Sequence, residues 1–248
     1  MKVKDILNFL ESKFPVSTAC EFDNVGLLVG DGEREVKNAM VALDCDITAV
    51  NKAREAGAQL IITHHPVIFD GLKAVTAGSI VYELIKSGIS VISMHTNLDI
   101  AEGGVTECLC EAIGLTDIKP FTANDGFVIR EAVCPISDAE KMALHIKESL
   151  GGGVRYVAGK TPINRVLVCS GSGGDFLADA INCGFDALIT ADVKHNVFID
   201  AINNGISLFD AGHYASENVI VEPLAELLSE EFKSVKFIQH SPHTIKSL

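Results

Sequence analysis

Histidines and carboxylates follow the predicted strands of this chain, at the point where each strand ends. In open parallel α/β sheets, binding and catalytic groups collect beyond the carboxyl ends of the strands. Imidazole nitrogens and carboxylate oxygens gathered in one place can bind metal ions or transfer protons. The candidates for such chemistry are His64 and His65 after the strand at 59–63, His95 and Asp99 after 89–94, Asp192 and His195 after 186–190, and His213 and Glu217 after 206–210.

Two of these sets share one spacing. His95 precedes Asp99 by four residues, His213 precedes Glu217 by four, and the corresponding members are 118 residues apart. A pseudo-twofold relation between the two halves of the chain would bring these sets face to face. Imidazoles combined with carboxylates suit Zn, Fe, Mn, Ni or Co better than an ion that prefers thiolates or oxygen alone. A bridging carboxylate would allow two divalent transition-metal ions about 3.5–4 Å apart.

A structural role is the alternative for a single histidine at a strand end, which often only forms a hydrogen bond. The adjacent pair His64-His65 and the two matched sets favour a metal site over that alternative. His145, His240 and His243 lie on a predicted helix or in the C-terminal tail. We expect these three histidines to be solvated or to pack against neighbours.

The elements that must position these residues alternate as β-α-β units. An amphipathic helix is expected at 5–13, and a strand-helix-strand-helix-strand pattern then occurs in each half. We therefore expect an α/β fold with two similar strand-helix-strand-helix-strand lobes, related by pseudo-duplication, and a metal site between them. The first lobe has strands at 39–44, 59–63 and 89–94 with helices at 47–56 and 79–87; the second has strands at 165–170, 186–190 and 206–210 with helices at 175–183 and 196–204.

The boundary between the two lobes is predicted from turn-forming residues. The segment 119–126 contains Pro120, Asn124 and Gly126, and a second loop is expected at 151–153, where three glycines follow one another. The predicted domains are thus residues 1–122, with the His-His and His-x-x-x-Asp motifs, and residues 123–248, with the His-x-x-x-Glu motif. We expect the C-terminal segment to intertwine with the first lobe.

Composition limits the classes of protein to which the chain can belong. The 248 residues include 33 acidic and 20 basic side chains, a net charge of −13, and no predicted helix has a basic stripe, which argues against nucleic-acid binding. No apolar run reaches the roughly 18 residues of a membrane span, and the amino terminus lacks a signal-peptide core, so we expect a cytoplasmic protein with no membrane partner. The seven cysteines form no Cys-x-x-Cys pair and are expected to be reduced and mostly buried, Cys169 and Cys183 among them.

Several motifs, spread over nearly the whole chain, carry a specific resemblance. They are Phe22-Asp23-Asn24-Val25-Gly26-Leu27-Leu28-Val29-Gly30, Ile62-Thr63-His64-His65-Pro66, His95-Thr96-Asn97-Leu98-Asp99, Gly171-Ser172-Gly173-Gly174 and Asp210-Ala211-Gly212-His213-Tyr214-Ala215-Ser216-Glu217. Together they resemble the hexameric dinuclear-metal-centre proteins, also called the NGG-interacting-factor family and named GTP cyclohydrolase I type 2 homologues.

This resemblance implies a set of metal ligands and an assembly. The ligands would be His64, His65, Asp99, His213 and Glu217. The two acids would bridge the ions, and which histidine binds which ion stays open. His95 and His195 would lie beside the ions, either as catalytic groups that donate to an oxyanion or shuttle a proton, or as supports that orient a ligand carboxylate. The family also implies a homo-oligomer, a hexamer.

Two positions depart from the family pattern, and one motif has two interpretations. Phe22 stands where the family has Trp, which preserves an apolar anchor. The segment 124–131 replaces a Gly-x-Gly-Arg-type turn, which puts the substrate suggested by the family name in doubt. Gly171-Ser172-Gly173-Gly174 would either cradle a phosphate with its amides or form a tight turn with positive φ, and the turn is favoured.

Two classes of function are consistent with these residues. A metal-dependent hydrolase would use its ions to lower the pKa of bound water from 15.7 to about 7 and so supply hydroxide at neutral pH. Two divalent ions with two carboxylates keep a positive charge, which favours a small anionic substrate such as a nucleotide. The family name suggests opening of the imidazole ring of GTP, although hydrolysis of a phosphoester or a cyclic amide would need the same groups. The alternative is a non-enzymatic metal-binding scaffold or adaptor protein.

Overall fold

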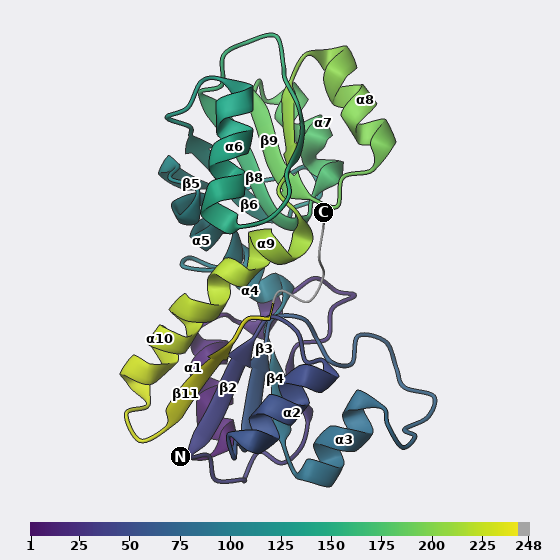
Figure 1. Cartoon of the computed structure of the whole chain (residues 1–248), viewed down its shortest axis with the longest axis vertical. Coiled ribbons are helices and arrows are strands. Elements are labelled where there is room, and N and C mark those ends of the chain that lie inside the picture. The colour runs from purple at the N-terminus through teal and green to yellow at the C-terminus, as the bar shows by residue number, and fades with distance from the viewer. Residues whose placement is uncertain (243–248) are drawn as a thin grey trace. The chain divides into compact units, whose positions relative to one another are not determined.

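Two α/β units make up the computed structural model, which describes residues 1–242 (Figure 1). The first unit contains residues 1–101 and 220–242, and the second contains residues 102–219. His243, predicted to be solvated or to pack, lies outside the described residues.

The first unit has a five-stranded sheet in the order β1-β4-β3-β2-β11. Strands β11, β2, β3 and β4 are parallel, and β1 is antiparallel to β4. The carboxyl ends of the four parallel strands therefore lie at the same edge of the sheet. The elements are α1 (Val3–Lys13), β1 (Gly26–Val29), β2 (Asn38–Ala42), α2 (Ile47–Glu55), β3 (Leu60–Thr63), α3 (Ile80–Ser87), β4 (Ser90–Ser93), α4 (Thr96–Ile100), α10 (Val221–Glu231) and β11 (Lys236–His240), with single 3₁₀ turns at Val16–Thr18 and Asn218–Ile220.

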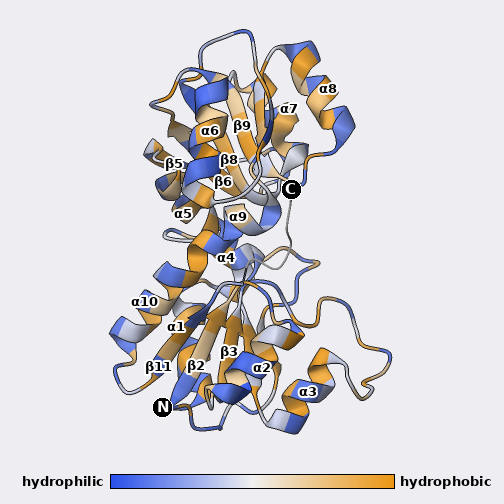
Figure 2. Ribbon diagram, in the orientation of Figure 1, coloured by the Kyte–Doolittle hydropathy of each residue, from blue (hydrophilic) through white to orange (hydrophobic). Residues whose placement is uncertain are grey.

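The central strands of this sheet are apolar and buried, as a parallel sheet covered on both faces requires. Leu60, Ile61 and Ile62 of β3 are fully buried, and Val50 and Leu84 from helices α2 and α3 belong to the core on one side. Figure 2 shows the hydrophobic residues concentrated on the strands. The strands are thus held rigidly, and the residues that follow them inherit fixed positions.

The second unit has a six-stranded sheet in the order β5-β6-β8-β9-β10-β7. Strands β8, β9 and β10 are parallel, while β5, β6 and β7 join by antiparallel pairing. The elements are α5 (Val105–Ala112), β5 (Thr116–Thr122), β6 (Val128–Val133), α6 (Ala139–Leu150), β7 (Arg155–Val157), β8 (Arg165–Ser172), a 3₁₀ turn at Gly174–Phe176, α7 (Leu177–Asn182), β9 (Ala187–Ala191), α8 (His195–Asn204), β10 (Ser207–Asp210) and α9 (His213–Glu217).

The predicted repeat is confirmed in both units. The first contains β2-α2-β3-α3-β4 and the second contains β8-α7-β9-α8-β10, each with its three strands parallel and in chain order. A five-residue helix follows the third strand in each case, α4 in the first unit and α9 in the second. These two short helices carry the matched His-x-x-x-acid sets.

The boundary between the units differs from the one predicted. Residues 119–126 do not link two lobes, because they form the end of β5 and the turn into β6, which pair within the second unit. The chain instead passes from the first unit to the second at 101–102 and returns at 219–220. The returning segment supplies α10 and β11, and β11 pairs in parallel with β2 from Lys236↔Asn38 to His240↔Ala42.

The cysteines carry no disulfide, and one of them differs from expectation. None of the seven, all of which lie within residues 1–242, forms a disulfide, and Cys108, Cys110, Cys134 and Cys169 are buried. Cys183 is exposed rather than buried, because it lies at the C-terminal end of α7, where the helix gives way to a turn. Within residues 1–242, no helix combines the length and the apolar character needed to cross a membrane.

Candidate metal centre

Three histidines of the first unit converge at the carboxyl ends of neighbouring strands. His64 and His65 directly follow β3, and His95 follows β4 with one residue between. Their ring centroids lie 4.9 to 5.6 Å apart, and each offers a nitrogen within 4.8 Å of the others. Imidazole nitrogens at this spacing can share one ion or belong to two adjacent ions.

Buried hydroxyl groups fix the backbone that carries the pair His64-His65. Thr63 Oγ1 donates to the carbonyl oxygen of His65 over 2.8 Å and lies 2.8 Å from Ser93 Oγ on the neighbouring strand. Both hydroxyl-bearing residues are fully buried. This network turns the chain sharply after β3, so that two consecutive imidazoles reach the same cluster.

Each of the three imidazoles has an acceptor at Nδ1. His64 Nδ1 lies 3.0 Å from the carbonyl oxygen of Met94, His65 Nδ1 lies 2.7 Å from Asp44 Oδ1, and His95 Nδ1 lies 2.9 Å from Asp23 Oδ1. A proton on Nδ1, donated to these acceptors, leaves the lone pair of Nε2 for a metal or a substrate. Hydrogen bonds of this kind to the second nitrogen accompany most metal-binding histidines.

Asp23 is the most strongly held of these acceptors. One of its oxygens contacts His95, and the other accepts hydrogen bonds from the amide and the hydroxyl of Thr96. Burial of Asp23 opposes its ionisation, but the bonds from His95 and Thr96 outweigh burial and set the pKa of this carboxyl well below its ordinary value. Asp23 is therefore a carboxylate at neutral pH, able to orient the His95 ring.

Asp99 joins the same region through the short helix α4. Its amide donates to the carbonyl oxygen of His95 over 3.0 Å, and its Oδ1 lies 3.6 Å from His64 Nε2. The four-residue spacing of His95 and Asp99 corresponds to one turn of this helix. The first unit thus supplies four of the predicted residues, His64, His65, His95 and Asp99, in one place.

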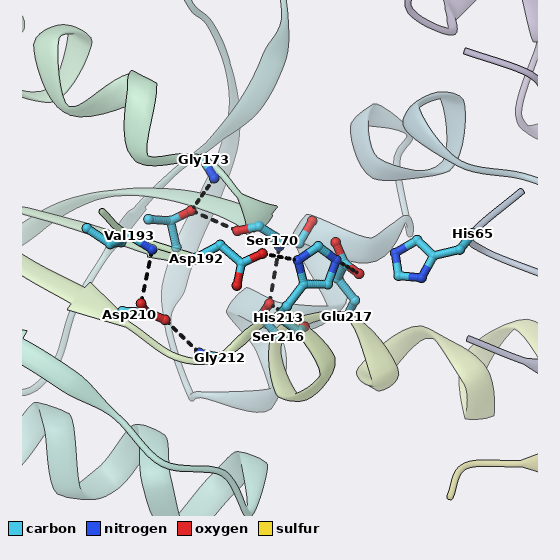
Figure 3. Close-up of polar contacts among 12 residues, drawn as sticks. His65, Ser170, Gly173, Asp192, Val193, Asp210, Gly212, His213, Ser216 and Glu217 are labelled. Carbon is cyan, nitrogen blue, oxygen red and sulfur yellow. Dashed lines mark hydrogen bonds and ion pairs between the residues drawn. The ribbon is translucent and has the colours of Figure 1, made fainter. Parts of the chain in front are cut away.

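The second unit carries the matched set on α9. His213 Nε2 lies 2.9 Å from Glu217 Oε2, and His213 Nδ1 lies 2.8 Å from Asp192 Oδ2 (Figure 3). His213 is therefore held at Nδ1 by a carboxylate, as His65 and His95 are. Asp192 adopts φ +51, a left-handed conformation that is uncommon for a residue other than glycine. This unusual conformation places the Asp192 carboxylate on His213.

A glycine leaves the room that Glu217 needs. A Cβ at Gly171 would come within 2.0 Å of Glu217 Oε1, and Gly171 has φ +58. Its amide donates to Ser216 Oγ, and the amide of Gly173 donates to Thr190 Oγ1 (Figure 3). Of the segment 171–174, Gly171 alone has the positive φ favoured from the sequence: Gly171 and Ser172 end β8 at a shift of its register with β9, and a 3₁₀ turn begins at Gly174. The amides of Gly171 and Gly173 are both used within the protein.

His195, His145 and His240 lie in surroundings different from those of the histidines described above. His195 is the exposed first residue of α8, and no hydrogen bond or ion pair joins it to His213 or Glu217 in the described part of the chain. His145 Nε2 contacts the carbonyl oxygen of Ile113 over 3.1 Å, a packing role. His240 lies in β11, where burial lowers its pKa.

Two residues that matter to the site, Asp23 and Asp44, carried no assignment from sequence reasoning, and a third, Asp192, was only one of the candidates that follow strands. Asp23 and Asp44 hold His95 and His65 from 72 and 21 positions away. Asp44 follows β2 as the histidines follow β3, and Asp23 lies inside the motif that opens with Phe22, which are the signals that could have found them. Asp192 follows β9 and was noted only for that position.

With this geometry established, known proteins provide a direct comparison. Residues 1–244 match the model of the family described as Duf34/NIF3 (NGG1p interacting factor 3). The chain belongs to the Duf34/NIF3 family. A relative from Clostridium perfringens named GTP cyclohydrolase 1 type 2 homolog is 35% identical, with 96% of this chain and 95% of the relative covered.

Solved structures agree with this assignment. The crystal structure of the Staphylococcus aureus hypothetical protein SA1388 has a TM-score of 0.92 and 29% identity, and the match covers 100% of this chain and 99% of that one. Reduced HcgD from Methanocaldococcus jannaschii has a TM-score of 0.84 and 29% identity over 96% and 97% of the two chains. The fold expected from the resemblance to this family is confirmed.

The donor set suits a transition metal. It combines imidazole nitrogens with carboxylate oxygens, contains no thiolate, and has its histidines anchored at Nδ1 in both units. Neutral imidazoles and carboxylates are the ligands of Zn and of other borderline divalent ions. The residues present therefore fit a metal-binding role.

Proposed function

We propose that this Duf34/NIF3 protein is a metal-dependent hydrolase with a dinuclear centre. By the resemblance to this family, the residues that would hold the ions are His64, His65, Asp99, His213 and Glu217. The observation that carries the proposal is the contact of His64, His65 and His213 with acceptors at Nδ1, which directs Nε2 to the cluster. Nε2 of His64 faces Asp99 and Nε2 of His213 faces Glu217, so a nitrogen and a carboxylate oxygen lie together as two ligands of one ion would.

Within this proposal the protein's own groups have separate tasks. Divalent ions bound by these ligands would supply a water molecule of lowered pKa as the nucleophile. Asp44 and Asp192 keep two of the ligand imidazoles in the required tautomer and orientation. His95 faces His64 and His65 while Asp23 holds its far nitrogen, so His95 Nε2 can donate a proton to, or take one from, a substrate beside the ligands.

A small anionic substrate is the class that this centre favours. Two divalent ions bring more positive charge than two carboxylates cancel, and the chain has a net charge of −13, so the centre would be a local exception to its surface. The relatives named GTP cyclohydrolase 1 type 2 homolog make a nucleotide, and GTP first, the substrate to examine. We propose a nucleotide or a similar small anion as the substrate. The bond hydrolysed would be a C–N bond of the imidazole ring of GTP, as the relatives' name suggests, with a phosphoester or a cyclic amide as the alternatives.

Turnover of a nucleotide panel by protein loaded in turn with Zn, Fe, Mn, Ni or Co tests this function. We expect at least one nucleotide to be hydrolysed, with activity lost on chelation and restored by the metal. The matched control is protein with both Asp99→Asn and Glu217→Gln, assayed with the same metals. Activity that survives chelation or both substitutions would contradict the proposal, and absence of turnover with every metal would favour the scaffold or adaptor alternative.

The family resemblance also leads us to propose a homohexamer. Six chains of 26.4 kDa give about 158 kDa, and closed cyclic or dihedral symmetry is the usual arrangement of such assemblies. Light scattering across a wide range of protein concentration is expected to return this mass. A mass of 26 kDa throughout would rule the hexamer out.

A further inference from the structure

Two exposed phenylalanines continue the histidine cluster of the first unit towards solvent. Phe22 and Phe69 are 68% and 47% exposed, which is unusual for large apolar rings, and their centroids lie 6.2 Å apart at 47°. Phe69 also contacts His95 edge-on, with centroids 6.1 Å apart at 81°. The rings of Phe22, Phe69 and His95 therefore form a continuous row in space. The row ends at His64 and His65, whose rings contact His95.

The row is held in place by polar contacts of the two residues that follow Phe22. Asp23, the next residue, binds His95 and Thr96. Asn24 Nδ2 donates to the carbonyl oxygen of Ile68 over 2.6 Å, which ties the loop of Phe22 to the residue before Phe69. Two loops 44 residues apart are thus joined so that their aromatic rings meet, and the exposed rings have fixed backbone positions.

Rings exposed in this way bind best to another flat ring. Aromatic pairs gain from offset or edge contacts beyond the area they bury, and stacking on exposed aromatic side chains is a common way to hold a planar heterocycle. A phosphate has no apolar face to offer, and a ribose has C–H groups but no aromatic ring. Phe69 is the phenylalanine that contacts His95, the residue proposed to exchange a proton with the substrate.

We propose that Phe22 and Phe69 form a stacking platform for a planar nitrogen heterocycle, such as a purine base, and present that ring to His95. This inference rests on the proposed function, because it names the part of the substrate that the centre would act on. Phe22 and Phe69 would then bind the substrate and determine its specificity. The base would supply most of the affinity at this platform, and the phosphate and the sugar would supply little.

The chain contains no tryptophan, which gives a direct test. Phe22→Trp introduces a single fluorophore on the platform, and Ile85→Trp introduces one at an exposed position on α3 of the same unit, where Ile85 is 62% exposed. Guanosine and ribose 5-phosphate are the probes, added to the purified full chain. We expect saturable quenching of the Phe22→Trp emission by guanosine, none by ribose 5-phosphate, and no saturable response in Ile85→Trp.

A second substitution measures the platform itself. Adding Phe69→Ala to Phe22→Trp is expected to weaken guanosine binding roughly 5- to 150-fold, the change that corresponds to the stacking of one base on one aromatic ring. Metal content of the variant is expected to stay unchanged, since neither phenylalanine offers a ligand. Equal responses from the Trp at position 22 and the Trp at position 85, or unchanged affinity after Phe69→Ala, would overturn the proposal.

The outcomes separate this inference from the proposed function. Metal-dependent turnover with a KM unaffected by Phe69→Ala would remove the platform and leave the hydrolase in place. Saturable stacking of guanosine on protein that hydrolyses nothing with any metal would remove the hydrolase and leave the platform. If Phe22→Ala and Phe69→Ala together lower the mass seen by light scattering, the rings belong to a contact between copies of the chain, and the platform is wrong.

Discussion

Replacement of Asp99 by Asn is expected to strip the protein of metal. Asp99 Oδ1 lies 3.6 Å from His64 Nε2, and the proposed centre uses this carboxylate as a bridge between two ions. An amide keeps the shape but loses the charge and one strong ligand oxygen. Loss of a residue that only supports a ligand typically costs about 10–100-fold in metal affinity, so loss of a bridging ligand is expected to cost more than that. Elemental analysis after gentle purification measures the ions retained per chain.

The control for this substitution is Asp179→Asn. Asp179 is buried like Asp99, and its Oδ1 accepts a hydrogen bond from the amide of Asn124 in the second unit. That variant is expected to keep two ions per chain. Loss of one ion rather than both in Asp99→Asn would make Asp99 a terminal ligand. A wild-type protein that never takes up more than one ion, even after titration, would defeat the dinuclear centre.

The repeated core of the fold was predictable because its signals are local. Strands such as β3 are short apolar runs, helices such as α3 start at a capping serine, and Gly88 ends that helix with φ +62. Ser79 Oγ accepts the amide of Tyr82 in the same turn. Each of these features depends on residues within a few positions, so sequence patterns alone locate both β-α-β-α-β units.

The remaining elements depend on pairing between distant segments. β5 is mostly exposed and contains Pro120, so it has neither an apolar run nor a regular alternation, and it exists because β6 pairs with it. β11 completes the first sheet after the chain has passed through the whole second unit. The predicted boundary at 119–126 was wrong for this reason, because a turn within one unit has the same residues as a linker.

The candidate site likewise has parts that depend on nearby residues and parts that depend on distant segments. His64, His65, His95, Asp99, His213 and Glu217 follow strands, and their positions could be read from the order of elements. Their hydrogen-bond partners could not, because Asp23 reaches His95 across 72 positions and Asp192 reaches His213 through a left-handed backbone. The sequence therefore predicted candidate ligands, while the structure supplied the groups that orient them.

Removal of the His95 ring is expected to abolish most turnover while metal stays bound. The proposed ligands do not include His95, and a positioned proton donor or acceptor typically contributes about 10²–10⁴-fold. His95→Ala should therefore lower kcat by that factor on the nucleotide that the panel identifies, with little change in KM and in metal content. Added imidazole is expected to restore part of the activity, because it can enter the space left by the missing ring.

Asp23→Asn tests whether His95 depends on its carboxylate. The Asn side chain cannot accept bonds from both His95 and Thr96 at its two ends, since one end is an NH₂ donor. We expect a loss of about 10–100-fold in kcat, again with metal retained and without rescue by imidazole. His145→Ala, which removes a packing histidine of the second unit, should leave kcat unchanged.

The effect of replacing His195 distinguishes the prediction made from the sequence from the one made from the structure. His95 and His195 were both predicted to act beside the ions, but of these two histidines His95 is the one with a carboxylate at Nδ1 and with imidazole neighbours. The structure therefore predicts a large loss for His95→Ala and a small one for His195→Ala. Equal losses would return His195 to the catalytic set, and loss of metal in proportion to activity in His95→Ala would make His95 a ligand instead of a proton carrier.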